Sequence, residues 1–479
     1  MAPANRASAL LEGPILRSLI TLALPIVFAN VLQAAYQIID AFWVGRLGAA
    51  AVAAVSVSFP VMFFTIAVGA GLAMAGSTLI AQYFGARNTA MVNHVAAQTL
   101  LMVMLASVTL GCAGYLITPG LLKLMGVAPD VFDHARGFMR VSFVGLVFNF
   151  TFFMFQSIMR GVGQTTLPIY IVLGTVVLNF ALDPLFIFGW GPIPALGVMG
   201  AALATLTTQS IAALGGLSVL LRGKYGIKLS LMAFRPDPAF MRRAFFLGLP
   251  ASVEMSARAL GLTVMTFLIA SFGTLAIAAY GVASNVLQVV MIPALGLSMA
   301  IATLVGQNIG AGNLARAERI GRLGALVGFT TLASIGLLVF LIAPALTAFF
   351  VPGDQNVIES GARVLRIMGP AWGFLGLQLA LTGVLRASGA MVMSMVLTLV
   401  SQWVMQFPLA YLLSVPGGLG ADGIWWAFPI ANISIALITL AIFAKGDWKK
   451  KRLTDPEERL TEKVSEEILT EEAFTRRGP

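Results

Sequence analysis

Three acidic side chains lie inside long apolar stretches of the sequence, where a charge is costly. They are Asp40, Asp183 and Glu254. If these stretches cross a bilayer, a charge at its centre costs about 2.5–3.5 kcal/mol on insertion scales, so each acid needs a partner or a water-filled cavity. Acids in such places typically bind a cation, carry a proton or line a transport path. These three positions are therefore the first candidates for chemistry.

Asp40 belongs to a polar stripe on one face of its predicted helix. Tyr36 lies one turn earlier, and Gln33 and Gln37 lie close by in a segment otherwise rich in Ala and Ile. Such a stripe is expected to face protein or water rather than lipid. The alternative is a structural role, in which Asp40 caps a kink in its helix or is hydrogen-bonded by neighbouring helices.

Asn179 and Asp183 are spaced i, i+4, and Pro184 interrupts the helix directly after the acid. Carboxylate, amide and phenol oxygens are hard ligands of the kind that Na⁺ uses, and a buried carboxylate can also carry a proton. The predicted coupling site for H⁺ or Na⁺ consists of Asp40, Asp183, Asn179 and Tyr36. The alternative is that Asp183 only caps the break at Pro184, and the residues alone do not show that the two acids meet.

Glu254 is followed by Arg258 at the same i, i+4 spacing. Opposite charges at this spacing on one helix can neutralise each other. We therefore predict a structural ion pair, with a functional Glu254 as the alternative.

Few residues are available for other chemistry. Cys112 is the only cysteine, so no disulfide can form within the chain. His94 and His134 are the only histidines, so a His/Cys zinc site has too few ligands. No G-x-x-x-x-G-K-[ST] nucleotide motif or catalytic constellation is present. The net charge of +10 forms no basic stripe interleaved with aromatic residues, so nucleic-acid binding is not expected. We expect no enzyme activity and no cofactor other than a coupling ion.

The composition specifies the environment of these residues. The chain has 479 residues, 58% hydrophobic and 10% charged, against roughly 25% charged in soluble domains. At about 20 residues per spanning helix, we predict an all-α polytopic membrane protein with twelve transmembrane helices, the first of them a retained helix rather than a signal peptide. The approximate spans are 17–44, 51–80, 94–117, 135–160, 165–189, 197–221, 240–270, 276–305, 317–343, 358–386, 391–415 and 420–444.

The second half of the sequence repeats the first at a spacing of about 225 residues. Leu22-Ala-Leu-Pro25 matches Leu247-Gly-Leu-Pro250, and AQYFGARN at 81–88 matches GQNIGAGN at 306–313. Six helices per repeat is an even number, so both repeats are expected to insert in the same direction.

Lys and Arg are unequally distributed between alternate loops, and the richer set, which includes Arg87, Arg160, Arg316 and Arg386, is assigned to the cytoplasm. Both termini are then expected in the cytoplasm, and the protein is expected in the cytoplasmic (inner) membrane. The predicted segments are a cytoplasmic N-terminus (1–16), an N-lobe (17–221), a cytoplasmic linker (222–239), a C-lobe (240–444) and a charged cytoplasmic tail (445–479).

Over residues 14–445 the sequence resembles the multidrug and toxic compound extrusion (MATE) transporters. The matching features are Leu24-Pro25, Asp40 with the following Val44-Gly45 and Leu47-Gly48, the Gln82 and Gln307 loops, Arg160-Gly161 and Asn179-x-x-x-Asp183-Pro184. The resemblance implies two six-helix lobes in a V around a central cavity, with Asp40 and Asp183 in one N-lobe cluster. It also implies a secondary antiporter that exports cationic or amphipathic drugs and toxic metabolites in exchange for H⁺ or Na⁺ by alternating access.

The pattern is more DinF-like than NorM-like. NorM-type relatives have a glutamate about two turns after the helix-seven proline and an aspartate in helix ten, whereas Arg258 and the uncharged stretch Phe374–Gln378 stand at these places here. A second cation site in the C-lobe is therefore not expected. Mid-span amides are candidates for cargo binding, although such amides are also common in helix packing. These candidates are Gln33, Gln37, Asn149, Gln156, Asn285 and Gln288.

The main alternative function is a lipid-linked oligosaccharide flippase of a related superfamily branch. Such a protein is expected to have a cavity rich in arginine, and Arg258 is the only arginine predicted in mid-span. A channel would not explain paired buried acids. The expected partners are a small-molecule substrate and the lipid bilayer, and the expected state is a monomer.

Overall fold

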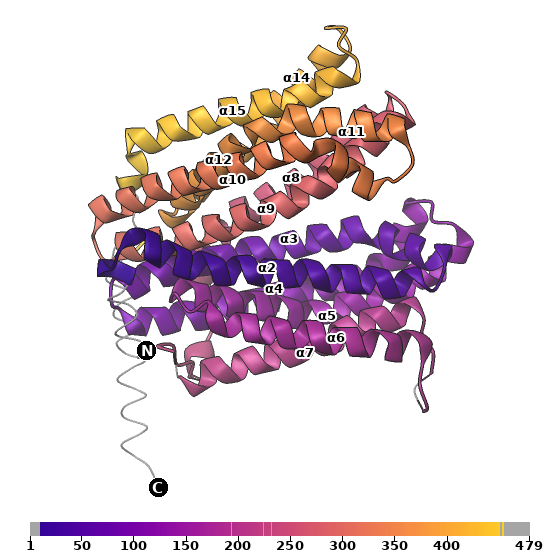
Figure 1. Ribbon diagram of the computed structural model, residues 1–479. Helices are drawn as coiled ribbons and strands as arrows, with labels where there is room; N and C mark the ends of the chain where they lie inside the picture. The colour runs from indigo at the N-terminus through magenta and orange to yellow at the C-terminus, as the bar shows by residue number, and fades with distance from the viewer. Residues whose placement is uncertain (1–9, 193, 224, 231, 451–452, 455–479) are drawn as a thin grey trace, which may run out of the picture. The chain divides into compact units, whose positions relative to one another are not determined.

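The computed structural model describes residues 10–192, 194–223, 225–230, 232–450 and 453–454. These residues form twelve helical segments that are long and apolar enough to span a membrane, which confirms the predicted number (Figure 1). In chain order the segments are α2 (Ile15–Gly45), α3 (Ala49–Gly85), α4 (Thr89–Leu124), α5 (Pro129–Gly161), α6 (Thr166–Phe188), α7 (Val198–Arg222), α8 (Pro238–Ala270), α9 (Thr274–Gly310), α10 (Leu314–Phe350), α11 with α12 (Gln355–Met368 and Trp372–Ala387), α13 with α14 (Met391–Leu399 and Phe407–Ser414) and α15 (Ala421–Lys445).

Two of the spans are interrupted. The 3₁₀ turn η2 (Gly369–Ala371) joins α11 to α12, and the π-helical segment η3 (Val400–Gln406) joins α13 to α14. The 3₁₀ turn η1 (Met232–Phe234) lies between α7 and α8, and η4 (Asp447–Lys450) follows α15.

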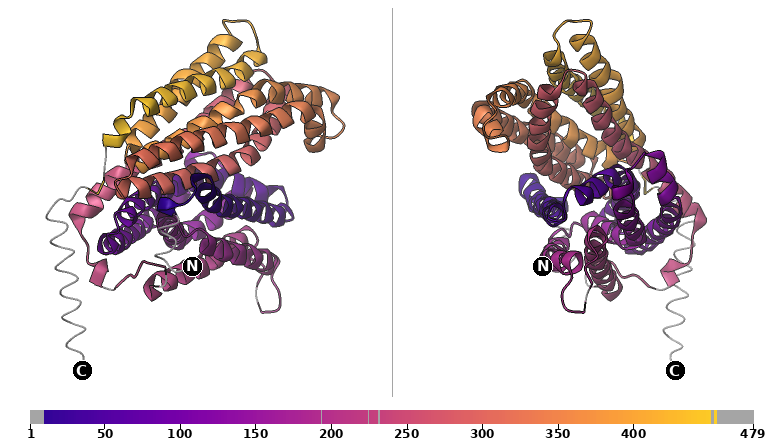
Figure 2. Two further views of the ribbon diagram at one scale, coloured as in Figure 1. Left: turned by 60° about the vertical axis from the view of Figure 1, so that its left-hand side comes forward. Right: turned by 90° about the vertical axis from the view of Figure 1, so that its right-hand side faces the viewer.

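The helices form two compact units, each of which is a bundle in both views of Figure 2. The N-unit contains Phe28–Ser252, and the C-unit contains Val253–Leu453 together with the start of α2 up to Val27. These bounds correct the predicted lobes, 17–221 and 240–444. The predicted lobes followed the sequence repeat, with one lobe for each repeat. In the structure, the first part of α2 and the first part of α8 each belong to the unit of the other repeat.

The first part of α2 is buried in the C-unit. Leu19, Leu22 and Ile26 are almost inaccessible to solvent and belong to one apolar core with residues of α9, α10, α12 and α15. Gly296 of α9 packs so closely against Val27 that a side chain at position 296 would collide with the Val27 side chain. This end of α2 therefore belongs structurally to the second repeat.

The first part of α8 is buried in the N-unit in the corresponding way. Ser252 Oγ donates a hydrogen bond of 3.0 Å to the carbonyl oxygen of Val68 in α3, and Gly248 packs against Leu72. Both helices pass from one unit to the other two residues after a proline, Pro25 in α2 and Pro250 in α8. A proline lacks the N–H that would bond four residues back, so it weakens the helix near each crossing.

The repeat is visible in the helix caps. Asn88 accepts a hydrogen bond from the Met91 amide at the start of α4 (3.0 Å), and Asn313 accepts one from the Arg316 amide at the start of α10 (3.1 Å). The preceding residue has a positive φ in both turns, 58° at Arg87 and 76° at Gly312. The second repeat therefore has a glycine where the first has a strained arginine.

The predicted linker, 222–239, overlaps the gap between α7 and α8, residues 223–237, and this segment is hydrogen-bonded to α4. Gln98 Nε2 donates to the carbonyl oxygens of Ala233 (2.9 Å) and Arg235 (2.7 Å), and Gln98 Oε1 accepts from the Asp237 amide (2.9 Å). Asp237 Oδ1 then accepts from the Phe240 amide at the start of α8 (3.1 Å). One buried glutamine thus attaches the linker to the N-unit.

The predicted tail, 445–479, is described only at its beginning. Trp448 of η4 is buried and stacks on Phe443, and Lys449 Nζ pairs with Glu318 Oε2 at 2.7 Å. Residues 455–479, and residues 1–9 of the predicted N-terminal segment, lie outside the described residues.

Candidate functional site

Asp40 and Asp183 meet in the N-unit, on α2 and α6. Asn179 Nδ2 donates a hydrogen bond of 3.1 Å to Asp183 Oδ1, as the i, i+4 spacing predicts. Both of these α6 side chains are fully buried, and Asp40 is half-buried. The Asp40 carboxyl group lies close to both Asp183 and Asn179. The three residues therefore form one cluster.

Two threonines of α7 complete this side of the cluster. Thr205 Oγ1 donates to Asp40 Oδ2 at 3.4 Å, and Thr208 Oγ1 lies 2.9 Å from the Tyr36 hydroxyl. Because the Thr208 hydroxyl donates to the Thr205 carbonyl oxygen at 3.0 Å, its single proton is used, and Tyr36 must be the donor to Thr208. The Tyr36 hydroxyl thus contacts Thr208, and its role as an ion ligand stays a prediction.

Three buried oxygens of the cluster lack a hydrogen-bond donor among the described residues. They are Asp40 Oδ1, Asn179 Oδ1 and Asp183 Oδ2. A buried acceptor left unpaired costs about 1–3 kcal/mol, and more when it is charged. Two carboxylates at this separation also repel each other unless a proton or a cation lies between them. The geometry therefore favours a bound proton or a small hard cation.

Aromatic side chains border the cluster. Trp43 lies on α2 close to Asp40, and its ring packs against Phe180 and Phe188 of α6, with centroid distances of 5.9 and 6.2 Å. An apolar border strengthens the electrostatic interactions beside it, because it excludes water. Sequence reasoning missed Trp43, which lies one turn C-terminal to Asp40, a spacing that could have indicated it.

The predicted cargo residues do not gather in one unit. Gln33, Asn149 and Gln156 are half-buried in the N-unit, where Gln37 is exposed, and Asn149 Oδ1 is a buried acceptor without a donor among the described residues. Asn285 and Gln288 are exposed on α9 of the C-unit. The six residues therefore remain candidates, and the contacts within each unit do not assemble them into a single site.

Glu254 contacts other side chains in addition to Arg258, its predicted partner. Arg258 Nη2 lies 3.5 Å from Glu254 Oε1, which confirms the proximity, but Arg386 Nη2 is closer, at 2.5 Å. Ser394 and Thr398 of α13 donate to the same carboxylate at 2.7 and 3.1 Å. The predicted Glu254–Arg258 pair is therefore present, and Arg386, which was assigned to a cytoplasmic loop, joins it from the last turn of α12.

Among the described residues, a metal site of another kind would need several His, Cys, Asp or Glu side chains close together. No group of three or more His, Cys, Asp and Glu side chains there could hold a metal ion. The Asp40 cluster has two acids and an amide, a donor set suited to H⁺ or Na⁺ rather than to a transition metal.

Two six-helix repeats with a carboxylate pair buried in spanning helices are typical of membrane transporters. The MatE family model matches residues 25–185 and 250–412, and the chain belongs to this family of transporters. The two matches begin at Pro25 and Pro250, the equivalent prolines of the repeat.

Individual relatives agree with this assignment over nearly the whole chain. The sequence is 29% identical to the probable multidrug resistance protein YoeA of Bacillus subtilis over 444 residues, which cover 91% of this chain and 95% of the relative. It is 27% identical to the FAD transporter of Shewanella oneidensis over 433 residues, covering 89% and 94%. An outward-facing structure of a multidrug resistance MATE family transporter of the MOP superfamily has a TM-score of 0.86 at 23% identity, covering 94% of this chain and 99% of that one, and so shares the fold.

Proposed function

We propose that this protein is a secondary antiporter of the inner membrane that exports amphipathic drugs and toxic metabolites in exchange for H⁺ or Na⁺. Coupling is assigned to Asp40, Asn179 and Asp183. The observation that carries the proposal is the convergence of three buried oxygens from these side chains, none of which receives a hydrogen bond from the described residues. A proton shared by the carboxylates, or a cation among the three oxygens, supplies the missing contact.

Transport follows if the ion and the cargo favour different arrangements of the helices. Binding of the ion neutralises the repulsion between Asp40 and Asp183, and its release restores that repulsion. Pro184 follows Asp183 directly inside α6, so the repulsion acts where the backbone hydrogen-bond ladder is already interrupted. We infer that this coupling of charge to helix geometry drives alternating access.

We assign coupling to the N-unit alone, as in the DinF-like branch. In the C-unit, Glu254 is already neutralised by Arg386 and bonded by two hydroxyl groups, so it is not free to bind a cation. The names of the relatives include both multidrug resistance and FAD transport, so membership of the family does not select one charge class of cargo. We expect the monomer to be the functional unit, with both termini in the cytoplasm.

The test is efflux of a fluorescent amphipathic dye from proteoliposomes under separately imposed H⁺ and Na⁺ gradients. We expect one of the two gradients to drive efflux by the wild type and neither to drive it in Asp40→Asn. Asp133→Asn is the matched control, because Asp133 is an exposed acid in the first turns of α5 that pairs with Arg136. Efflux that is independent of both gradients would contradict antiport and would direct attention to the flippase alternative.

A further inference from the structure

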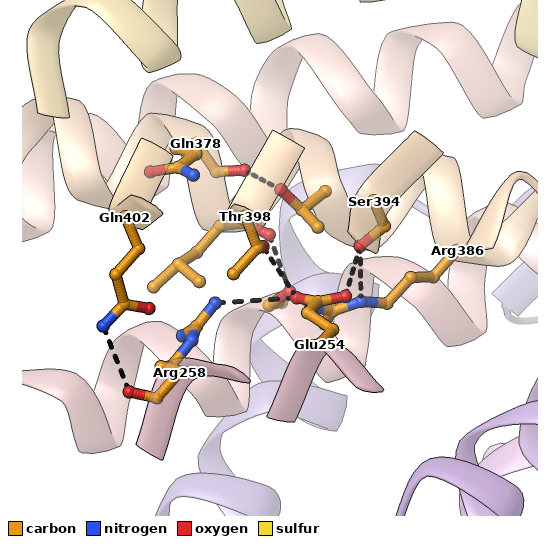
Figure 3. A network of polar contacts seen from close by, with 10 residues as sticks. Glu254, Arg258, Gln378, Arg386, Ser394, Thr398 and Gln402 are labelled. Carbon is orange, nitrogen blue, oxygen red and sulfur yellow. Dashed lines mark hydrogen bonds and ion pairs between the residues drawn. The ribbon is translucent and has the colours of Figure 1, made fainter. Parts of the chain in front are cut away.

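Glu254 contacts three side chains besides Arg258 (Figure 3). Arg386 Nη2 and Thr398 Oγ1 both contact Oε1, and Ser394 Oγ donates to Oε2. Arg386 Nε also donates to Ser394 Oγ at 3.1 Å, which closes a ring of hydrogen bonds between the two residues and the carboxylate. Glu254 is 3% exposed and Arg386 is 11% exposed, so this ring forms a buried, neutral ion pair.

Arg258 carries the positive charge that Glu254 does not neutralise once it is paired with Arg386. Its Nη2 lies 3.5 Å from Glu254 Oε1, beyond a normal hydrogen-bond length, and its side chain is 33% exposed. Among the contacts of the described residues, this guanidinium makes no hydrogen bond to the protein, although it has five N–H donors. Two arginines and one glutamate give the cluster a net charge of +1, located on the exposed arginine.

Arg258 lies far from both ends of its helix. At about 1.5 Å per residue, it lies roughly 30 Å along α8 from Pro238 and roughly 18 Å from Ala270. Both distances exceed the reach of an arginine side chain that extends towards a headgroup region. A positive charge at this depth is costly unless water or an anion contacts it.

A second feature of the backbone points to the same place. Gln402 lies in the π-helical segment η3, and its Nε2 donates to the Arg258 carbonyl oxygen at 3.1 Å. The absence of a side chain at Gly261 allows Gln402 to approach α8 this closely. A π-helical turn is rare and is frequent at functional sites. Here it fixes the turn of α8 that presents the guanidinium.

We infer that Arg258 binds an anionic oxygen group of the cargo, a carboxylate or a phosphate, so that the exported compounds include zwitterionic or anionic amphipathic molecules. This inference rests on the proposed export function and specifies its substrate class. The planar guanidinium matches such groups because two parallel N–H donors can reach two oxygens. Glu254 orients Arg258 through their 3.5 Å contact and leaves its donors available.

The experiment measures binding to the purified full-length protein. The probes are two forms of one rhodamine dye: its methyl ester, which is a cation, and its free carboxylate, which is a zwitterion. We expect the wild type to bind the carboxylate form more tightly than the ester, as measured by fluorescence anisotropy. Arg258→Gln should weaken binding of the carboxylate form about tenfold to hundredfold, the effect of losing a charged hydrogen bond, and leave binding of the ester within about twofold.

Two further variants separate recognition from folding. Arg258→Lys keeps the charge and loses the forked geometry, so it should retain part of the preference for the carboxylate. Glu254→Gln combined with Arg386→Gln removes the buried pair and the contact that orients Arg258 but keeps the guanidinium, so the preference for the carboxylate should weaken and not disappear. A wild type without this preference, or an equal loss of both dye forms in Arg258→Gln, would overturn the inference.

Efflux of the same dyes distinguishes this inference from the proposed function. Arg258→Gln should still export the ester under the driving gradient, because the Asp40 cluster is intact. If the wild type shows the preference for the carboxylate while neither gradient drives efflux of either dye, the anion site stands and the antiport mechanism fails.

Discussion

Asp40 of α2 and Asp183 of α6 place two carboxyl groups close to each other inside the N-unit. Their approach links the first helix of the chain to the proline break in the fifth span. Each acid also has an oxygen without a donor among the described residues, which is the basis for our proposal that a proton or a cation joins the pair. The ionisation of one acid then depends on the other.

The first prediction concerns this dependence. Asp40→Asn, Asp183→Asn and the double variant should all lose gradient-driven efflux to a similar extent, because either change already dismantles the shared site. Folding should be retained, since an amide supplies donors to oxygens that lacked them. Efflux and the thermal unfolding midpoint in detergent measure the two effects. Losses that add independently, or normal coupling in Asp183→Asn, would show that Asp183 only caps the break at Pro184.

The second prediction concerns the buried pair in the C-unit. Glu254→Gln strands Arg386, and loss of one member of a buried pair costs about 3–5 kcal/mol of unfolding free energy. Adding Arg386→Gln should restore most of that stability, and adding Arg258→Gln should restore little, because Arg258 is further from the carboxylate and partly exposed. Thermal midpoints of the three variants provide the comparison. A larger rescue by Arg258→Gln would make Arg258 the principal partner of Glu254.

A third prediction uses the direction of one hydrogen bond. Tyr36→Phe removes the donor to Thr208 and should cost about 1 kcal/mol of stability, the value of one neutral hydrogen bond. Gradient-driven efflux should persist, since the hydroxyl contacts Thr208 rather than the carboxylates. Efflux as low as that of Asp40→Asn, in a variant of normal thermal stability, would instead make the hydroxyl an ion ligand.

The fourth prediction compares the equivalent turns of the two repeats. Arg87 has a φ of 58°, in the region that favours glycine, and the matching residue is Gly312. Arg87→Gly should stabilise the protein by up to about 1 kcal/mol, because relief of the strain exceeds the added freedom of the unfolded chain. Gly312→Arg should destabilise it by about 1–2 kcal/mol. Opposite shifts of the thermal midpoint are expected, and shifts of the same sign would be evidence against equivalent turns.

The number of spans and the repeat could be predicted from the sequence because both depend on local information. Apolar runs set the spans, and Pro25 and Pro250 mark the same place in each repeat. The division into units could not be predicted in this way, because it depends on which surfaces pack together. The burial of Leu22 among residues of the second repeat leaves no local pattern in the sequence.

In the candidate site, too, the contacts set by spacing along one helix could be predicted, and those set by packing between helices could not. The contact between Asn179 and Asp183 follows from helical spacing, whereas the approach of Asp40 depends on the packing of α2 on α6. Thr205 and Thr208 were missed, although a cluster of threonines in an apolar helix was a usable signal. Arg386 was assigned to a loop because it is a charged residue near a span end, but helical side chains lean towards the N-terminus of their helix and can reach back into the bundle.

The crossing of α2 between units has a consequence for the order in which the protein is made. Leu19 and Leu22 leave the ribosome first, yet the core that buries them is supplied by α9, α10, α12 and α15, which are synthesised much later. Until then these leucines can lie against lipid tails, which are as apolar as the eventual core. The start of the first span is therefore inserted early and packed late. A nascent chain that stops at the linker would hold a complete set of six spans and still lack the surface on which its first helix comes to rest.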